Sequence, residues 1–481
     1  MTTILDKVKH VIVVMLENRS FDHMLGWLVN PNAMPAQERA KETLGKSPDH
    51  SHRGVMWQLL GHKPLHLPAP TGPITMDGFA ASYDSVWRGH GSEVLRGFMP
   101  DQVPVLSALA SGFAVCTRWF CSLPGQTWPN RNFAHAGTSD GDVNIVPRLY
   151  RNPTIFERIE AAGKAWRVYH EGPAEIWCFP ALWSRESRNR YGDHADLLSE
   201  IRNDQLPEYA FVEPDHGLIF REAFESSDSQ HPANNPPKSA GRDFLSGEWL
   251  LHYIYTALAS RRGVFEKTLL VVTYDEHGGF ADHVPPPSDA VAPDDEGKDF
   301  HFTLLGPRVP TLLVSPWIPS GLRLPNQPPT ETIDFTFDHC AIPRTVRELF
   351  APGSAPLSRR EAVASMFLPA LSLDAPRPDL PVTRPRELPV PRHPDRVMLG
   401  SAALAGPPRP LDDFQQSLVE LAQLVDQALR TEAARPLALR ADIIESVLAS
   451  PPPPRVFTTE AERQLYLYDV TRRLQRQPFR P

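Results

Sequence analysis

The sequence predicts an α/β fold: a mostly parallel central sheet with helices on both faces. Three apolar runs are typical of strands buried on both sides: His10–Leu16, Thr268–Tyr274 and Thr311–Ser315. Between such runs lie stretches with apolar residues at helical spacing, and Ser246–Ser260 is the clearest of them. Because strands alternate with helices along the chain, the connections favour a parallel sheet covered on both sides.

The composition is typical of a globular protein. Hydrophobic residues make up 41% of the 481 residues and charged residues 22%. The net charge of −8 gives no broad electrostatic basis for nucleic-acid binding, so no nucleic-acid partner is expected. The four cysteines have neither CxxC nor zinc-site spacing, which favours scattered thiols over two disulfides.

Changes in composition divide the chain into three parts. Residues 1–375 carry the strand and helix pattern and form the expected catalytic domain. Residues 376–410 are dense in Pro and Arg and predict an extended linker. Residues 411–481 predict a helical extension, with helices over Leu411–Arg430 and Thr458–Leu474. We expect the chemistry before the linker, and we expect the extension to dock to a membrane surface, a sister subunit or an export apparatus.

No targeting segment is expected at the N-terminus. The apolar stretch Val11–Leu16 is short and is followed at once by Glu17, which does not fit a signal peptide. No run approaches the ~20 apolar residues of a membrane span. We therefore expect a chain that is cytoplasmic as synthesised, with export by a non-classical route left open.

Acidic and amide side chains follow two of the predicted strands. Glu17 and Asn18 follow the first strand, and Asp275 and Glu276 follow the strand Thr268–Tyr274. Parallel strands present their carboxyl ends at one edge of a sheet, so these groups are expected together. Buried carboxylates cost several kcal/mol each unless a cation compensates them, and oxygen ligands suit a hard or borderline divalent metal. The structural alternative pairs Glu17 with Arg19 and makes Asp275 a helix cap.

A constrained turn in Ser122–Arg131 presents Thr127 between Pro124 and Pro129. A hydroxyl becomes a good nucleophile when a base or a metal lowers its pKa, and a turn aimed at the metal would provide that. The alternative makes Thr127 a simple N-cap of a helix running through Phe133–Ala136.

Histidines in polar loops are candidates for proton transfer. His277 and His283 lie beside the expected metal ligands, and His216 and His231 lie in turn-rich loops. Phosphoryl transfer needs an acid for the leaving oxygen and cationic groups near the developing charge. Each histidine taken alone is more often structural.

The motifs together resemble one family. They match, in the same order, the phosphoesterase family, which contains the bacterial non-zinc-type phospholipases C and the respiratory-burst-inhibiting acid phosphatases. The likeness covers roughly residues 7–350 and rests on these segments: Glu17–His23, Gln102–Pro104, Pro124–Arg131, Tyr274–Gly279, Asp282-His283 and Phe337–His339.

The resemblance implies an alkaline-phosphatase-like fold with one tightly held divalent metal, for which Fe, Zn, Mn or Ca are all open. It implies that Thr127 ligates the metal and forms a covalent phospho-enzyme. The remaining implied ligands are Glu17, Asn18, Asp275 and Glu276. Among the histidines, His231 and His216 are the better matches to those near the phosphate, followed by His277 and His283. Arg131 either clamps the phosphate or braces the nucleophile turn.

The expected activity is hydrolysis of phosphoric ester bonds. Phospholipase C action on phospholipid phosphodiesters, with possible peripheral membrane contact, is the leading assignment. Acid phosphatase action on phosphomonoesters is the alternative within the family. A non-catalytic, metal-bearing phospholipid-binding protein is the alternative from another class, and the intact Thr127 argues against it. The sequence indicates neither the head group nor the oligomeric state.

Overall fold

The computed structural model of the chain describes most of its residues: 4–29, 39–66, 73–183, 190–219, 227–232, 242–294, 300–325, 336–387, 406–408, 410–434, 445–447 and 449–476. The predicted linker lies partly outside this set, because residues 388–405 and 409 are not among the described ones.

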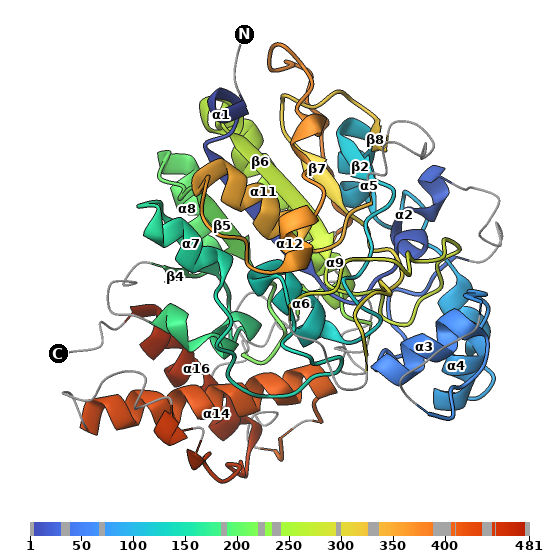
Figure 1. Cartoon of the computed structure of the whole chain (residues 1–481), viewed down its shortest axis with the longest axis vertical. Helices are drawn as coiled ribbons and strands as arrows, with labels where there is room; N and C mark the ends of the chain where they lie inside the picture. The colour runs from blue at the N-terminus through green and yellow to red at the C-terminus, as the bar shows by residue number, and fades with distance from the viewer. Residues whose placement is uncertain are drawn as a thin grey trace.

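An eight-stranded sheet forms the centre of the molecule (Figure 1). Its order is β4-β3-β5-β1-β6-β7-β2-β8, and every pair is parallel except those that β7 makes with β6 and β2. The strands are β1 (His10–Leu16), β2 (Ala114–Cys116), β3 (Trp166–Tyr169), β4 (Tyr191–Gly192), β5 (Tyr209–Val212), β6 (Thr268–Tyr274), β7 (Leu312–Val314) and β8 (Leu322–Leu324).

The three apolar runs are strands, as predicted. β1 and β6 are the two longest strands, neighbours in the sheet and paired along their whole length, from His10↔Thr268 to Leu16↔Tyr274. All seven side chains of β6, and all but the first of β1, are buried, which explains their continuous apolar character. The antiparallel direction of β7 is not readable from its apolar run, because a buried strand has the same composition in either direction.

The helices that flank the sheet pack in two groups. One group joins α6, α7, α11 and α12, and the other joins α5, α8, α9 and α10. The predicted α/β class with a mostly parallel sheet is therefore confirmed. The helices before the linker are α1 (Ile4–Lys7), α2 (Phe21–Val29), α3 (His52–Leu60), α4 (Phe79–Val86), α5 (Pro104–Gly112), α6 (Thr127–Ala136), α7 (Ile155–Ala161), α8 (His194–Asn203), α9 (Arg242–Ser260), α10 (Arg262–Phe265), α11 (Ala341–Phe350) and α12 (Arg359–Val363), with 3-10 turns η1 (Gly91–Leu95), η2 (Glu175–Cys178), η3 (Pro180–Trp183) and η5 (Leu368–Ala370).

The C-terminal helices pack against the rest of the chain. α14 (Asp413–Ala434) contacts η2 and α16 (Glu460–Arg476), and α16 also contacts β4 (Figure 1, orange to red). These two helices correspond to the predicted segments Leu411–Arg430 and Thr458–Leu474. The domain boundaries at 375 and 410 stay predictions.

The start of the predicted linker, residues 376–387, lies without helix or strand along α9. Tyr255 and Trp249 of α9 donate hydrogen bonds to the carbonyls of Pro381 (2.6 Å) and Arg386 (3.0 Å). This part of the chain is therefore a strap that is fixed to the catalytic domain by backbone acceptors.

Two further sequence expectations concern the cysteines and membrane spans. Cys116, Cys121, Cys178 and Cys340 are all buried free thiols, as the spacing favoured. Within the described residues, no helix has both the length and the apolar character needed to cross a membrane.

Candidate active site

The register of β1 and β6 brings the two acidic motifs together. Leu16 and Tyr274 are paired, so the next residues of both strands leave the sheet at the same edge. Asp275 Oδ1 accepts hydrogen bonds from the backbone N–H of Asn18 (2.9 Å) and of Glu276 (2.7 Å). The predicted juxtaposition of these segments is therefore present.

The turn after β1 has a tight, left-handed backbone. Asn18 has φ of 57°, a conformation that Asn tolerates better than most residues. Gly278 packs directly on it, and a Cβ at that glycine would lie 2.1 Å from the Asn18 carbonyl oxygen. Gly278 also donates its N–H to Glu276 Oε2 (2.8 Å). Only a glycine at 278 lets the two motifs approach so closely while orienting the Glu276 carboxylate.

Three buried carboxylates share one buried guanidinium at this edge. Arg131 donates to Glu213 Oε2 (2.5 Å) and lies 3.6 Å from Glu17 Oε1 and 3.5 Å from Asp275 Oδ2. It also donates to the Met15 carbonyl (3.1 Å). These contacts correspond to the bracing role left open for Arg131. Glu213, at the end of β5, is a partner that sequence reasoning missed.

The negative charge at the site exceeds the positive charge around it. Burial raises the pKa of Glu17 well above its usual value, and burial together with Asp275 raises that of Glu276 to about 8. Asp275 Oδ2 and Glu276 Oε1 are buried and accept no hydrogen bond from the described part of the chain. The raised pKa values of Glu17 and Glu276 favour their protonated forms unless a cation compensates the charge. The residues present therefore fit a divalent cation held by oxygen ligands.

Thr127 begins helix α6 and faces the first motif. Its hydroxyl lies 3.5 Å from Asn18 Oδ1, to which it donates, and its side chain is fully buried. Gln126 holds the N-cap position, so Thr127 is the first helical residue and not the cap. The positive end of the ten-residue helix lies at the Thr127 hydroxyl, where it would stabilise an oxyanion.

Asn130 fixes the turn that carries Thr127. Its side-chain NH₂ donates to the carbonyls of Gly125 and Gln126, each at 3.1 Å, and its Oδ1 accepts from Leu123 N (3.3 Å). These bonds join the turn to the first turn of α6. The orientation of Thr127 is therefore preorganised.

His216 and His277 lie beside metal-ligand candidates. His216 Nδ1 is 3.3 Å from Glu17 Oε1, and its ring is buried. His277 Nδ1 is 3.3 Å from Glu276 Oε2, and its Nε2 is 2.7 Å from Gln58 Oε1. Burial lowers the pKa of both imidazoles, to about 4 for His216 and about 3 for His277, so both are neutral. The contacts of His277 suit it to orienting Glu276.

His231 has a partner from the C-terminal extension. Its Nδ1 lies 3.9 Å from Asp412 Oδ2, just before α14, and its ring centroid is 6.1 Å from that of His50. The extension also places the edge of Phe414 against the His216 ring (4.8 Å), and Gln415 Nε2 donates to the His216 carbonyl (2.7 Å). Residues beyond the linker therefore contact two of the candidate histidines, and the expectation that the chemistry precedes the linker stays a prediction.

His50 and Asp412 were both missed from the sequence. His50 lies in the uninformative stretch between the first two motifs, and its imidazole is close enough to Glu276 to lower the pKa of that carboxyl. Asp412 lies in the predicted helical segment Leu411–Arg430 and caps the helix, because its Oδ1 accepts from Gln415 N (2.7 Å). No sequence signal distinguishes such a cap from a carboxylate that also faces a histidine.

His283 belongs to a second cluster. Its Nδ1 is 2.6 Å from Asp22 Oδ2, and the ligand atoms of Asp22, Asp282 and His283 lie within 4.8 Å of one another. This spacing is compatible with a metal ion, and the sequence prediction did not include this set. However, Arg308 donates to Asp22 Oδ1 and Asp282 Oδ1, both at 2.9 Å, and so supplies the compensating charge itself. The described contacts of His283 are with this group.

Comparisons with known proteins identify relatives along most of the chain. The model of the phosphoesterase family matches residues 8–351. The chain is 33% identical over 461 residues to non-specific phospholipase C3 of Arabidopsis thaliana, covering 87% of this chain and 82% of that protein. It is 27% identical over 482 residues to the non-hemolytic phospholipase C of Burkholderia pseudomallei, covering 83% of this chain and 64% of that one.

Among solved structures, a protein in the alkaline phosphatase superfamily from Vibrio parahaemolyticus matches with a TM-score of 0.35 and 11% identity, covering 75% of this chain and 71% of that one. The family match and the phospholipase C relatives confirm the predicted family and hydrolase class. The chain belongs to the phosphoesterase family.

Proposed function

We propose that this chain is a phospholipase C that cleaves phospholipid phosphodiesters through a phospho-enzyme on Thr127. One observation carries the proposal: a buried threonine at a helix N-terminus faces Asn18 beside the carboxylates of Glu17, Asp275 and Glu276. The likeness to non-specific phospholipase C3 supports the choice of a phospholipid as substrate.

Glu17, Asn18, Thr127, Asp275 and Glu276 are the residues that would hold a divalent cation. When bound there, the cation would neutralise buried carboxylates, polarise the phosphoryl group and favour the alkoxide form of Thr127. Glu276 Oε1 and Asp275 Oδ2 are buried and accept no hydrogen bond from the described residues, which supports this fit, although Asp275 Oδ2 lies 3.5 Å from Arg131 Nε.

The reaction has two displacements. Thr127 Oγ1 attacks phosphorus, the bond to the diacylglycerol oxygen breaks, and that oxygen leaves with a proton. Water then attacks the phosphothreonine, so that the P–O bond to Thr127 breaks and the phosphorylated head group is released. The positive end of α6 stabilises the Thr127 oxyanion in both steps.

Neutral histidines carry the protons. Burial and the neighbouring His50 hold the pKa of His231 well below its usual value, so its imidazole is neutral at neutral pH. We assign His231 as the group that takes the Thr127 proton, returns it to the leaving oxygen and later deprotonates water. Asp412 stabilises the imidazolium form from the Nδ1 side. His216, beside Glu17, is the second candidate for proton transfer.

The test compares two substitutions at Thr127 with the wild-type chain. Thr127→Ala should lose hydrolysis of phosphatidylcholine by about 10³-fold or more, while Thr127→Ser should keep part of it because the hydroxyl remains. Metal content by elemental analysis and melting temperature should be close to wild type in both variants. Unchanged turnover by Thr127→Ala would overturn the mechanism.

The same preparations separate the substrate classes. The proposal expects phosphatidylcholine to be cleaved to diacylglycerol and a phosphorylated head group, with a higher kcat/KM than a simple phosphomonoester. A higher kcat/KM for the monoester would instead establish the acid phosphatase alternative. Metal binding without turnover of either substrate would favour the non-catalytic alternative, a metal-bearing phospholipid-binding protein.

A further inference from the structure

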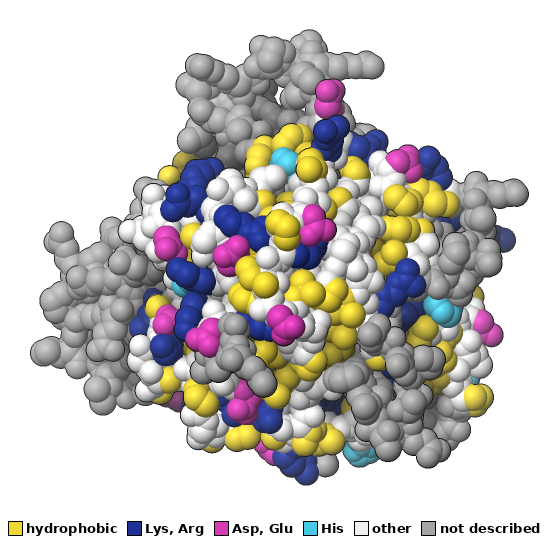
Figure 2. All heavy atoms as spheres, turned by 90° about the horizontal axis from the view of Figure 1, so that it is seen from above, with side chains coloured by type: hydrophobic (Ala, Val, Ile, Leu, Met, Phe, Trp, Pro, Cys, Tyr) yellow, Lys and Arg dark blue, Asp and Glu magenta, His cyan; other side chains and the backbone are white. Residues whose placement is uncertain are grey.

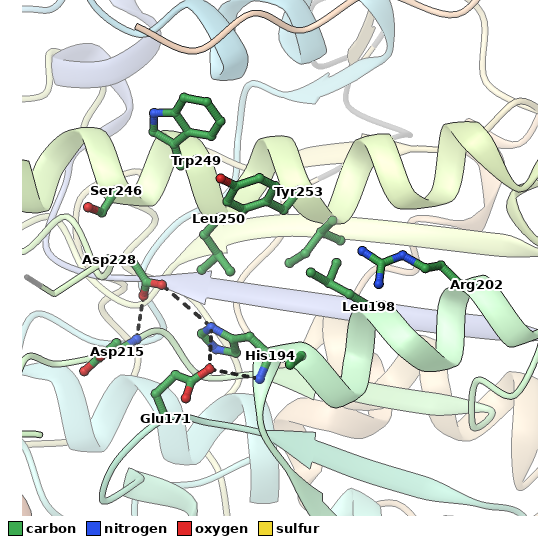
Figure 3. A pocket seen from close by; sticks show the side chains of 12 residues that line it. Glu171, His194, Leu198, Arg202, Asp215, Asp228, Ser246, Trp249, Leu250 and Tyr253 are labelled. Atoms are coloured by element: carbon green, nitrogen blue, oxygen red, sulfur yellow. Dashed lines mark hydrogen bonds and ion pairs between the residues drawn. The ribbon is translucent and has the colours of Figure 1, made fainter. Parts of the chain in front are cut away.

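A cavity outside the active site lies between α8 and α9 (Figure 3). Its volume is about 380 Å³, which is within the range of small-molecule sites. Leu198 of α8 and Leu250 of α9 provide apolar walls, and Trp249 and Tyr253 add two aromatic rings from α9. None of the residues assigned to the proposed reaction lines it.

One end of the cavity is acidic. Glu171, Asp215 and Asp228 gather there around His194, whereas Arg202 lies at the opposite end (Figure 3). His194 Nδ1 is 3.5 Å from Glu171 Oε1 and 3.7 Å from Asp228 Oδ2. These groups belong to separate loops and to α8, so the fold has brought three carboxylates and one imidazole to the same place.

The hydrogen bonds of His194 define its charge. Its Nε2 lies 2.8 Å from the Glu213 carbonyl oxygen, which only accepts, so Nε2 carries a hydrogen. Its Nδ1 faces two carboxylates, and a bare lone pair there would be repelled. His194 is therefore an imidazolium, in agreement with a pKa raised by Glu171 and Asp228 against the effect of burial. One positive charge thus faces three carboxyl groups.

Asp215 and Asp228 retain unused acceptor capacity. Asp228 Oδ1 accepts from Asp215 N (2.5 Å), and Asp215 Oδ1 accepts from Gly217 N (2.7 Å). Asp215 is 6% exposed and lines the cavity. Burial and mutual repulsion raise the pKa of Asp215 to about 7 and burial raises that of Asp228 to about 6. A cation in the cavity would remove this repulsion.

The aromatic wall selects the kind of cation. The rings of Trp249 and Tyr253, one helical turn apart, have centroids 5.3 Å apart and an interplanar angle of 41°. Trp249 is held by its bond to the Arg386 carbonyl, and Tyr253 is 40% exposed at the surface. Aromatic faces attract organic cations, and apolar walls do not suit a hydrated metal ion.

We propose that the cavity between α8 and α9 binds an organic ammonium ion, with the charged nitrogen toward Asp215 and Asp228 and the alkyl groups against Trp249 and Tyr253. The two loops that form its acidic end, residues 213–217 and 227–231, also carry His216 and His231. The bound cation therefore stabilises the loops behind the proton-transfer groups. This site goes beyond the proposed function and does not depend on phospholipid cleavage.

The test uses choline and its neutral isostere, 3,3-dimethylbutan-1-ol, titrated into the full chain by calorimetry. Choline should bind and the isostere should not, because the two differ only in charge. Asp228→Asn and Trp249→Leu should each weaken choline binding by about tenfold or more. Asp289→Asn, an exposed carboxylate outside the cavity, is the matched control and should bind as wild type.

Two comparisons locate the site and the source of the ligand. Thr127→Ala should bind choline normally, because the cavity is separate from the active site. If phosphatidylcholine vesicles displace choline and phosphatidylglycerol vesicles do not, the ligand is a lipid head group. If neither kind of vesicle displaces choline, the ligand is a free amine. Equal binding of choline and its isostere, or wild-type binding by both Asp228→Asn and Trp249→Leu, would overturn the proposal. So would loss of choline binding in Thr127→Ala.

Discussion

At the scale of single residues, the candidate site combines groups that the sequence separates widely. Thr127, Glu17 and Glu276 come from three motifs, and a fourth segment adds Asp412 from beyond the Pro-rich stretch. The motif residues have local signals, because acidic residues directly follow two buried strands and a threonine lies in a Pro-Gly turn. Asp412 has no such signal, since its importance comes only from the histidine that it faces, His231. Glu213 also follows a buried strand, β5, but its sequence does not indicate that it faces Arg131.

Asp412→Asn should lower kcat by about 10- to 100-fold with little change in KM, because the neutral amide no longer stabilises the His231 imidazolium. Asn keeps the oxygen that accepts from Gln415 N, so the helix cap survives. The pH profile of kcat should move as well. Asp413→Asn, an exposed neighbour, is the control. A wild-type kcat and pH profile in Asp412→Asn would rule out this role.

Arg131→Gln should destabilise the fold by about 3–5 kcal/mol, because it leaves the carboxylates of Glu213, Glu17 and Asp275 without their guanidinium. The free energy of unfolding in urea measures this directly. If Arg131 instead clamps the substrate phosphate, its substitution should lower activity and leave the free energy of unfolding unchanged. If Arg131→Gln were as stable as wild type and lost only activity, the bracing role would be incorrect.

At the scale of elements, the long strands β1 and β6 and the helical segments of the C-terminal extension were predictable, whereas the surface against which the extension packs was not. Long runs of buried positions, six in β1 and seven in β6, make these two strands clear in the sequence, and their pairing explains why the acidic motifs meet at one edge of the sheet. The helical period of α14 was also visible. The helical period does not indicate which surface the helix packs against, because an amphipathic face can pack on a membrane, on a partner or on the same chain. The structure places that face on η2 and α16.

Glu248 of α9 joins two helices in a pH-dependent way. Its carboxylate accepts from Val105 N (2.6 Å) and Leu106 N (3.1 Å) at the start of α5, and burial raises its pKa to about 7. Between pH 4.5 and about 7, the Glu248 carboxyl has lost its proton in the unfolded chain but keeps it in the folded state. The folded state then binds more protons, so the stability that Glu248 contributes is present below this range and is lost as pH rises through it.

Glu248→Gln should therefore reduce the fall in unfolding free energy between pH 5 and pH 7, by on the order of 1 to 3 kcal/mol. Urea unfolding at both pH values gives the slope. Glu387→Gln, an exposed glutamate, is the control and should keep the wild-type slope. An equal slope in Glu248→Gln and wild type would refute the assignment.

At the scale of the whole molecule, one sheet edge organises the candidate site, and the C-terminal extension reaches it from outside the family match, which ends at residue 351. The surface is chemically mixed: on the face in Figure 2, basic, acidic and apolar side chains are interspersed. A face with this mixture of side chains does not indicate which substrate or surface the protein binds. The substrate must therefore be established by experiment at the site itself.

Removing the metal should affect stability and activity together. The carboxylates of Glu17, Asp275 and Glu276 repel one another without a cation, so dialysis against a chelator should lower the melting temperature and abolish hydrolysis. Adding back the metal found by elemental analysis should restore both. Full activity in a preparation shown to be free of metal would contradict the predicted site.

The most direct test of the central claim is to trap the phospho-enzyme. Phosphatidylcholine labelled at phosphorus is mixed with the wild-type chain, the reaction is quenched in acid within the first turnover, and the peptides are mapped by mass spectrometry. The proposed mechanism predicts the label on Thr127, its disappearance on further incubation, and no label in Thr127→Ala. Rapid hydrolysis with no label on Thr127 at any quench time, together with full turnover in Thr127→Ala, would contradict it.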